Sequence, residues 1–255
     1  GLEGVTSYYE PLHHLLAEVT AGSLGTTLSA NPTMVGHPSL DRPYLDEYSG
    51  HIDPAGQGVD GYRGEFAYRL YCCDENDGEG ELRTLLKRYL DGLISDTLFG
   101  KVVLQFNRTA LRQQWLKQHF PEAVSIYLLR DPRDQWQSVV SIADRLGYVG
   151  FLDLEMAALS QNHRSKESLG LNTVIAMMNF RGKDVAEDLS FYAKLRKKYG
   201  LVELYAQLVW HWLTALSLAL ETSAFIVDLN RLSESQHYQE EVVGHFEELG
   251  FAGLD

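Results

Sequence analysis

The chain has 255 residues and a formal net charge of −13, with 35 Asp and Glu against 22 Lys and Arg. A strongly acidic surface repels nucleic acid and anionic lipid, so general binding to either is disfavoured, whereas a small local basic site is compatible with this charge. The hydrophobic fraction of 45% and the charged fraction of 22% are typical of a globular protein. The length suffices for one large domain.

The two cysteines, Cys72 and Cys73, are adjacent, which suits neither a disulfide framework nor a tetrahedral metal site. We therefore expect reduced cysteines, no bound metal and a cytoplasmic protein. The longest apolar stretch, 201–220, is nearly as long as a membrane span. Its polar residues, however, recur at helical spacing and form one stripe, so we interpret it as a buried central helix. The stripe consists of Glu203, Gln207 and His211.

The N-terminal part of the chain predicts an extended SYY segment followed by a helix of about ten residues through PLHHLLAEVT. Pro11 is expected at the first helical position, where it holds Glu10 out of the α region. Residues 21–64 are interrupted by glycine and proline without a sustained period. We predict a long irregular insertion there, and a solvated turn at the acidic stretch 74–80.

From residue 81 onward the hydrophobic pattern becomes regular and alternates between helices and short apolar strands. This alternation indicates an α/β fold with a mainly parallel sheet, in a single domain over 1–255. The expected helices cover 81–98, 108–120, 201–220 and about 233–250, with one more opened by Asp131 and Pro132. The expected strands cover 101–106, 124–129 and 224–229.

The turn after the strand at 124–129 carries the most informative residues. Asp131 can cap the following helix, and Pro132 fits its first turn. In open α/β sheets, ligands bind at the carboxyl ends of strands, beside helix N-termini that attract anions. Arg130 therefore stands where a phosphate would bind. Helical periodicity alone would make Arg130 an exposed arginine in a turn and Ser138 a solvated serine on the surface. This surface interpretation and the phosphate-binding interpretation both stay open at this point.

Arg130 is followed eight positions later by Ser138, after a YLL strand and with DPRD between them. This arrangement resembles the 3′-phosphate-binding motif of sulfotransferases that use 3′-phosphoadenosine-5′-phosphosulfate (PAPS). Further segments resemble the branch of this family that contains carbohydrate and related bacterial enzymes, and together they span most of 8–141. They are YYEPLHH at 8–14, HPSLDRPYLDEY at 37–48, VLQFNR at 103–108 and WLKQHFP at 115–121.

The resemblance implies a sulfotransferase fold, with a P-loop-NTPase-like parallel sheet flanked by helices. It also implies transfer of a sulfuryl group from PAPS to a hydroxyl of a carbohydrate or small metabolite. Arg130 and Ser138 would then grip the 3′-phosphate through charge-assisted and hydroxyl hydrogen bonds. Glu10 would be the general base, or else a carboxylate at a helix boundary. His13 or His14 could serve as the base instead, because histidine titrates near neutral pH.

Arg108 begins a predicted helix after a strand, where it could meet anionic groups of the donor or acceptor. Pairing with one of the many carboxylates is the other interpretation. The family also has a Gly-Thr-Thr-type loop that cradles the 5′-phosphosulfate. The segment GSLGTT at 22–27 follows YYEPL, has no strand before it and carries no Lys or Arg, so we reject it as that loop.

In the order of the family, the phosphosulfate loop would precede Gly1, so we expect a fragment that lacks the first strand and loop. The alternative is a non-catalytic sulfotransferase-like binding or interaction protein that has lost donor binding. A nucleotide-dependent kinase is disfavoured because the chain contains no GxxxxGK[ST] sequence.

Overall fold

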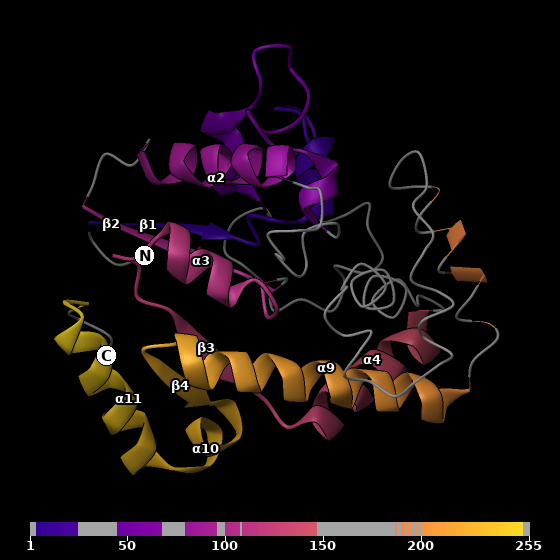
Figure 1. The fold of residues 1–255 in the computed structure, drawn as a ribbon, viewed down its shortest axis with the longest axis vertical. Coiled ribbons are helices and arrows are strands. Elements are labelled where there is room, and N and C mark those ends of the chain that lie inside the picture. Colours follow the sequence, from indigo (N-terminus) through magenta and orange to yellow (C-terminus); the bar gives the residue numbers. More distant parts are fainter. Residues whose placement is uncertain are drawn as a thin grey trace.

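The computed structural model describes residues 4–24, 45–67, 80–95, 100–107, 109–146 and 200–251, with six further positions between 187 and 197. The described chain is a mixed α/β fold with two small parallel sheets and helices around them (Figure 1). The strands are β1 (Val5–Tyr9), β2 (Lys101–Gln105), β3 (Ile126–Leu129) and β4 (Phe225–Asp228). The 3-10 helices are η1 (His14–Ala17), η3 (Asp46–His51) and η4 (Gly64–Ala67). The α-helices are α2 (Gly80–Ser95), α3 (Gln113–His119), α4 (Pro132–Leu146), α9 (Leu201–Thr222), α10 (Leu229–Glu234) and α11 (Gln236–Glu248).

Both strand pairings are parallel, which confirms the class predicted from the alternation of helices and strands. Val5 of β1 pairs with Lys101 of β2, and Ile126 of β3 pairs with Phe225 of β4. Parallel neighbours need a crossover connection, and here the connections contain α2 in the first sheet and α4 and α9 in the second. The expected single sheet is therefore present as two separate pairs of strands among the described residues.

Each sheet has one edge that side chains close. The backbone N–H of Tyr9 donates to Glu47 Oε1 (2.8 Å), and the carbonyl of Tyr9 accepts from the Tyr48 hydroxyl (3.0 Å), so η3 covers the outer edge of β1. In the second sheet, the Tyr238 hydroxyl accepts from Asp228 N–H (3.0 Å) at the outer edge of β4. Among the described residues, the outer edges of β2 and β3 have no such covering hydrogen bonds.

The main hydrophobic core lies between β1, η1, η3, η4 and α2. Leu16, Tyr48, Phe66 and Leu86 are fully buried there. The Tyr89 hydroxyl of α2 donates to the Pro11 carbonyl (2.9 Å), which ties the segment after β1 to this core. The core therefore holds the carboxyl end of β1 and the residues that follow it in a fixed place.

The helix predicted over PLHHLLAEVT is wrong, because only η1, four residues long, forms there. The carbonyl of Leu16 accepts from Val59 N–H (2.8 Å), and that of Val19 accepts from Gly58 N–H (2.7 Å). These carbonyls are therefore bonded to the loop at 58–59 instead of to a further helical turn. A contact distant in sequence has overridden a local helical pattern.

Two other predicted helices differ in their limits. The helix expected from residue 108 begins at Gln113, and Arg112 just before it is buried with its guanidinium donating to the Phe66 carbonyl (2.7 Å). Arg108 itself lies outside the described residues. The last helix is divided into α10 and α11 at Ser235, whose backbone is extended and whose hydroxyl accepts from Tyr238 N–H.

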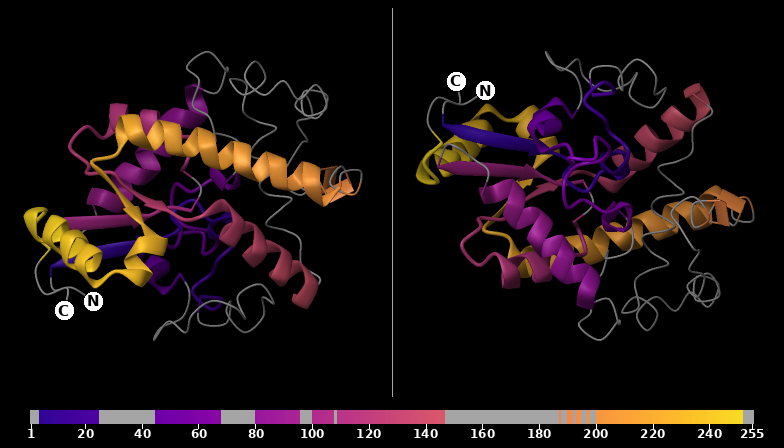
Figure 2. Two further views of the ribbon diagram at one scale, coloured as in Figure 1. Left: turned by 90° about the horizontal axis from the view of Figure 1, so that it is seen from below. Right: turned by 90° about the horizontal axis from the view of Figure 1, so that it is seen from above.

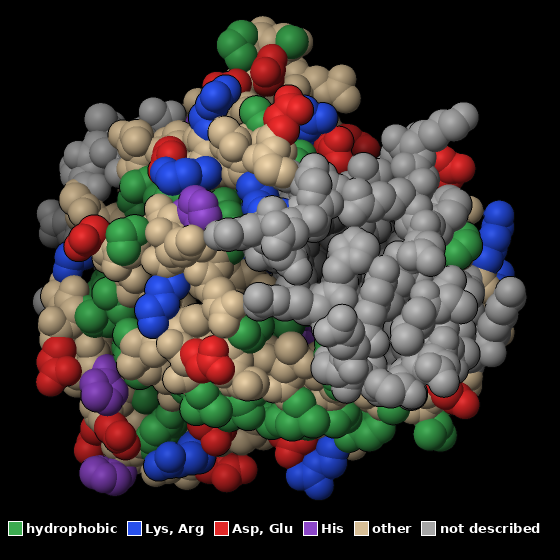
Figure 3. All heavy atoms as spheres, in the orientation of Figure 1, with side chains coloured by type: hydrophobic (Ala, Val, Ile, Leu, Met, Phe, Trp, Pro, Cys, Tyr) green, Lys and Arg blue, Asp and Glu red, His purple; other side chains and the backbone are tan. Residues whose placement is uncertain are grey.

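Helix α9 is only partly buried, so the prediction of a buried central helix holds for one face of it. Leu204, Ala215 and Ala219 are buried, and α9 contacts α3 and α4. Val202 and Leu220, by contrast, are 79% and 71% exposed. Figure 3 shows a row of apolar side chains where α9 lies in Figure 1. Within the described part of the chain, no helix is long and apolar enough to cross a membrane.

Gly58 provides a test of the contact that limits η1. Its φ is +79°, and an added Cβ would lie 3.0 Å from the Ala17 carbonyl oxygen. We expect Gly58→Ala to lower the free energy of unfolding by about 1–3 kcal/mol, from left-handed strain and from this close contact. Gly56 is the matched control, with φ +86° and open space around its Cβ position. Chemical denaturation should show a smaller loss for Gly56→Ala, and equal losses would contradict this role of Gly58.

Candidate functional site

The candidate residues form two groups, one after β3 and one after β1. Arg130 directly follows β3, and Glu10 directly follows β1. Figure 2 shows these strands running in the same general direction, so their carboxyl ends face the same side of the molecule. In parallel sheets this is the side on which ligands bind.

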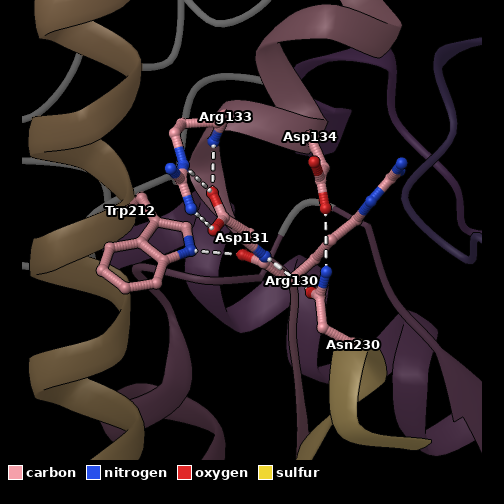
Figure 4. Close-up of polar contacts among 6 residues, drawn as sticks. All are labelled: Arg130, Asp131, Arg133, Asp134, Trp212 and Asn230. Carbon is pink, nitrogen blue, oxygen red and sulfur yellow. Dashed lines mark hydrogen bonds and ion pairs between the residues drawn. The ribbon is translucent and has the colours of Figure 1, made fainter. Parts of the chain in front are cut away.

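The turn after β3 is held to two other helices through hydrogen bonds (Figure 4). Trp212 Nε1 of α9 donates to the Arg130 carbonyl (2.8 Å), and Asp131 N–H donates to Asn230 Oδ1 of α10 (3.1 Å). The Asn230 amide group donates in turn to Asp134 Oδ2 in the first turn of α4 (2.8 Å). The backbone of Arg130 is therefore fixed by partners about a hundred residues away in sequence.

Asp131 caps α4, as the sequence predicted. Its Oδ1 accepts from the backbone N–H of Arg133 (2.8 Å), and its Oδ2 is 2.7 Å from the Arg133 guanidinium. The hydrogen bond from the Arg133 side chain, followed by the one from its backbone, lowers the pKa of Asp131 to about 2. The N-terminus of α4 thus carries a carboxylate of its own. An anion at this site must therefore be bound mainly by side chains outside the cap.

The Arg130 guanidinium provides such a group. Its side chain is exposed, and no hydrogen bond or ion pair joins it to another described residue. Figure 4 shows it extending away from Arg133 and Trp212, whereas Arg133 is paired with Asp131. An arginine that is not already neutralised can give short, charge-assisted hydrogen bonds to phosphate oxygens.

Ser138 is half-buried in the second turn of α4, on the same strand–turn–helix unit as Arg130. It lies four positions after Asp134, so the two share one face of the helix. Helical rise separates Ser138 from Asp131 by about 10 Å. Among the described residues no direct contact joins Ser138 to Arg130, so a shared ligand would have to bridge them.

Glu10 has an unusual backbone conformation. Its φ is +45°, in the left-handed region that non-glycine residues rarely adopt, at a cost of about 1–3 kcal/mol. Its N–H donates to the Gln105 carbonyl (2.8 Å), and its carbonyl accepts from His13 N–H (2.8 Å). The side chain is buried, with 7% of the residue exposed. Strain of this kind at a buried carboxylate is typical of functional sites.

Two side chains lie against the Glu10 carboxylate. The Asn107 amide group donates to Oε1, and His13 Nε2 lies 3.5 Å from Oε2. His13 and His14 are stacked, with 4.5 Å between their ring centroids. The structure therefore brings together Glu10 and both histidines that the sequence singled out. Asn107 is exposed, so the Oε1 side of the carboxylate lies next to the molecular surface.

Helix η3 holds the two tyrosines that precede Glu10. Glu47 accepts from Tyr9 N–H, and the Tyr8 hydroxyl lies 2.8 Å from His51 Nε2. Burial raises the pKa of Tyr9, and the negative charges of Glu10 and Glu47 raise it further. Burial also holds the pKa of Tyr48 far above its usual range. Both tyrosines are therefore neutral hydroxyl groups near pH 7.

Sequence reasoning did not assign roles to Asn107, Glu47, Trp212 or Asn230. Asn107 could have been found from its place after β2, beside the end of β1. Glu47 lies inside the segment 37–48 that carried the family resemblance. No comparable feature of the sequence points to Trp212 or Asn230. No described contact joins the Glu10 group to the Arg130 group, and Arg108 and the GTT residues at 25–27 lie outside the described residues.

Comparison with protein-family models, with curated proteins and with solved structures found no match. Within the described ranges, no cluster of three or more His, Cys, Asp or Glu could hold a metal ion.

The Asp131–Arg133 pair predicts a titration that can be measured directly. The pKa of Asp131 is about 2 in the folded protein, below the usual value near 3.9. The stabilisation from this carboxylate is therefore complete above about pH 4 and is lost as the pH falls towards 2. Arg133→Ala should move the Asp131 pKa upward, though not fully to 3.9, because the backbone N–H still donates. Carboxyl ¹³C NMR measures the titration, and an unchanged value would show that the Arg133 side chain is not the cause.

Proposed function

We propose that this protein is a PAPS-dependent sulfotransferase that acts on a hydroxyl of a carbohydrate or small metabolite. The observation that carries the proposal is the exposed guanidinium of Arg130, which has no ion-pair partner among the described residues. It lies in the turn between a parallel strand and a helix, and Ser138 follows on that helix. This is the arrangement that the Arg–Ser motif needs to bind the 3′-phosphate of the donor.

The edges of the two sheets support a sulfotransferase fold as part of the same proposal. The outer edges of β1 and β4 are covered by side chains, whereas those of β2 and β3 have no covering hydrogen bonds among the described residues. Both pairs are parallel, and in Figure 2 β2 is the strand of the first sheet that lies nearer to the second. One further parallel strand would join them into a P-loop-NTPase-like sheet. In the sulfotransferase fold, that strand leads into the 5′-phosphosulfate loop.

Electrostatics favours Arg130 over its neighbour as the donor-binding arginine. Arg133 is neutralised by Asp131, while Arg130 stands apart from that pair. On a protein with a net charge of −13, a guanidinium without an ion-pair partner among the described residues forms a small basic site in an otherwise negative surface. A phosphate bound there would gain charge-assisted hydrogen bonds, and Ser138 would add a hydroxyl donor.

Glu10 is the general base in this proposal. The acceptor oxygen attacks the sulfur of PAPS, the bond from sulfur to the phosphate oxygen breaks, and 3′-phosphoadenosine-5′-phosphate (PAP) leaves. The Glu10 carboxylate takes the proton that the acceptor hydroxyl loses. Asn107 and His13 hold the carboxylate at the surface end of β1, where a hydroxyl could approach its Oε1 side. As in phosphoryl transfer, positioning of the in-line groups supplies most of the catalysis.

The burial of Glu10 favours a second candidate function. A carboxylate on a residue that is 7% exposed, hydrogen-bonded by Asn107 and adjacent to His13, is also suited to a purely structural role. The protein would then be a non-catalytic sulfotransferase-like binding protein. Binding of PAP without any turnover of PAPS would identify this second function.

The donor site is tested by calorimetric titration of the complete polypeptide with PAP. Arg130→Ala should weaken PAP binding about 10- to 100-fold, because it removes hydrogen bonds from a charged group. Arg133→Ala is the matched control, since its guanidinium is already paired with Asp131, and we expect a change of less than about threefold. Absence of PAP binding by the wild-type protein, or equal affinity of Arg130→Ala and wild type, would contradict the donor site.

The base is tested by turnover of labelled PAPS with a panel of neutral sugars as acceptors. Glu10→Gln should lower kcat by about 10²- to 10⁴-fold, because the amide cannot accept the proton, while the affinity for PAP is retained. Glu18→Gln, at an exposed carboxylate just after η1, should leave kcat unchanged. A wild-type rate in Glu10→Gln would remove Glu10 from the mechanism.

A further inference from the structure

His13 makes two different contacts through its two ring nitrogens. Its Nδ1 accepts from the backbone N–H of Leu15 (3.2 Å) and so caps η1. Its Nε2 lies 3.5 Å from Oε2 of Glu10, and only 5% of the residue is exposed. A single buried ring therefore links the start of a helix to the candidate base.

The cap determines which nitrogen carries the proton. A neutral imidazole has one donor and one acceptor nitrogen. Because Nδ1 accepts from Leu15 N–H, the proton of the neutral ring is on Nε2, which faces the Glu10 carboxylate. An ionised carboxylate only accepts hydrogen bonds, so this tautomer presents a matching donor to it. Stacking on His14, with ring centroids 4.5 Å apart, holds the ring in this orientation.

Asn107 and His13 approach different oxygens of the same carboxylate. Asn107 donates to Oε1, and His13 Nε2 faces Oε2. Two donors from different segments fix the plane of a carboxylate more firmly than one donor does. Catalytic bases are commonly oriented by a third group in this way.

We propose that His13 is the positioning residue for Glu10, in an inference that rests on the proposed sulfotransferase function. Its Nε2–H orients the carboxylate that accepts the proton of the acceptor hydroxyl. His13 itself does not touch the substrate. It acts through Glu10, and it does so because the cap of η1 fixes its tautomer.

A simpler role for His13 would be to cap η1 alone, and two variants separate the roles. The side-chain oxygen in His13→Asn can still accept from Leu15 N–H, but no donor reaches Glu10. The longer amide in His13→Gln places a donor near the position of Nε2, but the cap is lost. We expect His13→Asn to keep a melting temperature close to wild type, and His13→Gln to melt several degrees lower.

For kcat we expect the two variants in the opposite order to their melting temperatures. His13→Asn should lower kcat about tenfold or more without changing the affinity for PAP, because the base is no longer aligned. His13→Gln should keep kcat within about threefold of wild type at a temperature where it is folded. A cap-only role predicts the reverse, with full activity in His13→Asn.

A spectroscopic measurement separates failure of this inference from failure of the proposed function. The ¹³C resonance of the Glu10 carboxyl group at neutral pH should be close to wild type in His13→Gln and shifted in His13→Asn. If wild type neither binds PAP nor turns over PAPS, the sulfotransferase proposal fails, while this resonance still tests whether His13 orients Glu10. A Glu10 resonance that is the same in wild type and His13→Asn would overturn the positioning role.

Discussion

The hydrogen bond from Glu10 N–H to the Gln105 carbonyl is the constraint on which the site after β1 depends. It continues the β1–β2 ladder by one residue beyond Tyr9, while the left-handed φ of Glu10 turns the chain out of the strand. The Tyr9 backbone is held on its other side by η3. With both sides fixed, the side chain of Glu10 is directed into the space between His13 and Asn107. The strain is tolerated because the surrounding core determines this conformation.

The charged side chains at the end of β3 are also held in a defined arrangement. Asp131 and Arg133 neutralise each other and complete the cap of α4, and Asn230 connects Asp134 to the same turn. The backbone of Arg130 is also held in place, by the hydrogen bond from Trp212, while its guanidinium is exposed. A binding group that is held in place by its backbone loses less conformational freedom when a ligand arrives.

Much of the fold was predictable from the sequence because it depends on local patterns. Helix α2, the strands β2, β3 and β4, and the cap by Asp131 follow from hydrophobic periodicity and from residue types at helix ends. The parallel pairing follows from the alternation of strands with helices. The length of η1 was not predictable, since backbone amides of the distant loop at 58–59 bind the carbonyls that a longer helix would use.

For the candidate site, the sequence by itself determined which residue types follow each strand, and hence Glu10, Arg130 and Ser138 as candidates. Tertiary structure decided their surroundings. It placed Asn107 and His13 on the two oxygens of Glu10, and it paired Arg133 instead of Arg130 with Asp131. The physical reason is that a side-chain motif is read along the chain, whereas burial, tautomer and charge pairing depend on groups that only folding brings within hydrogen-bond distance.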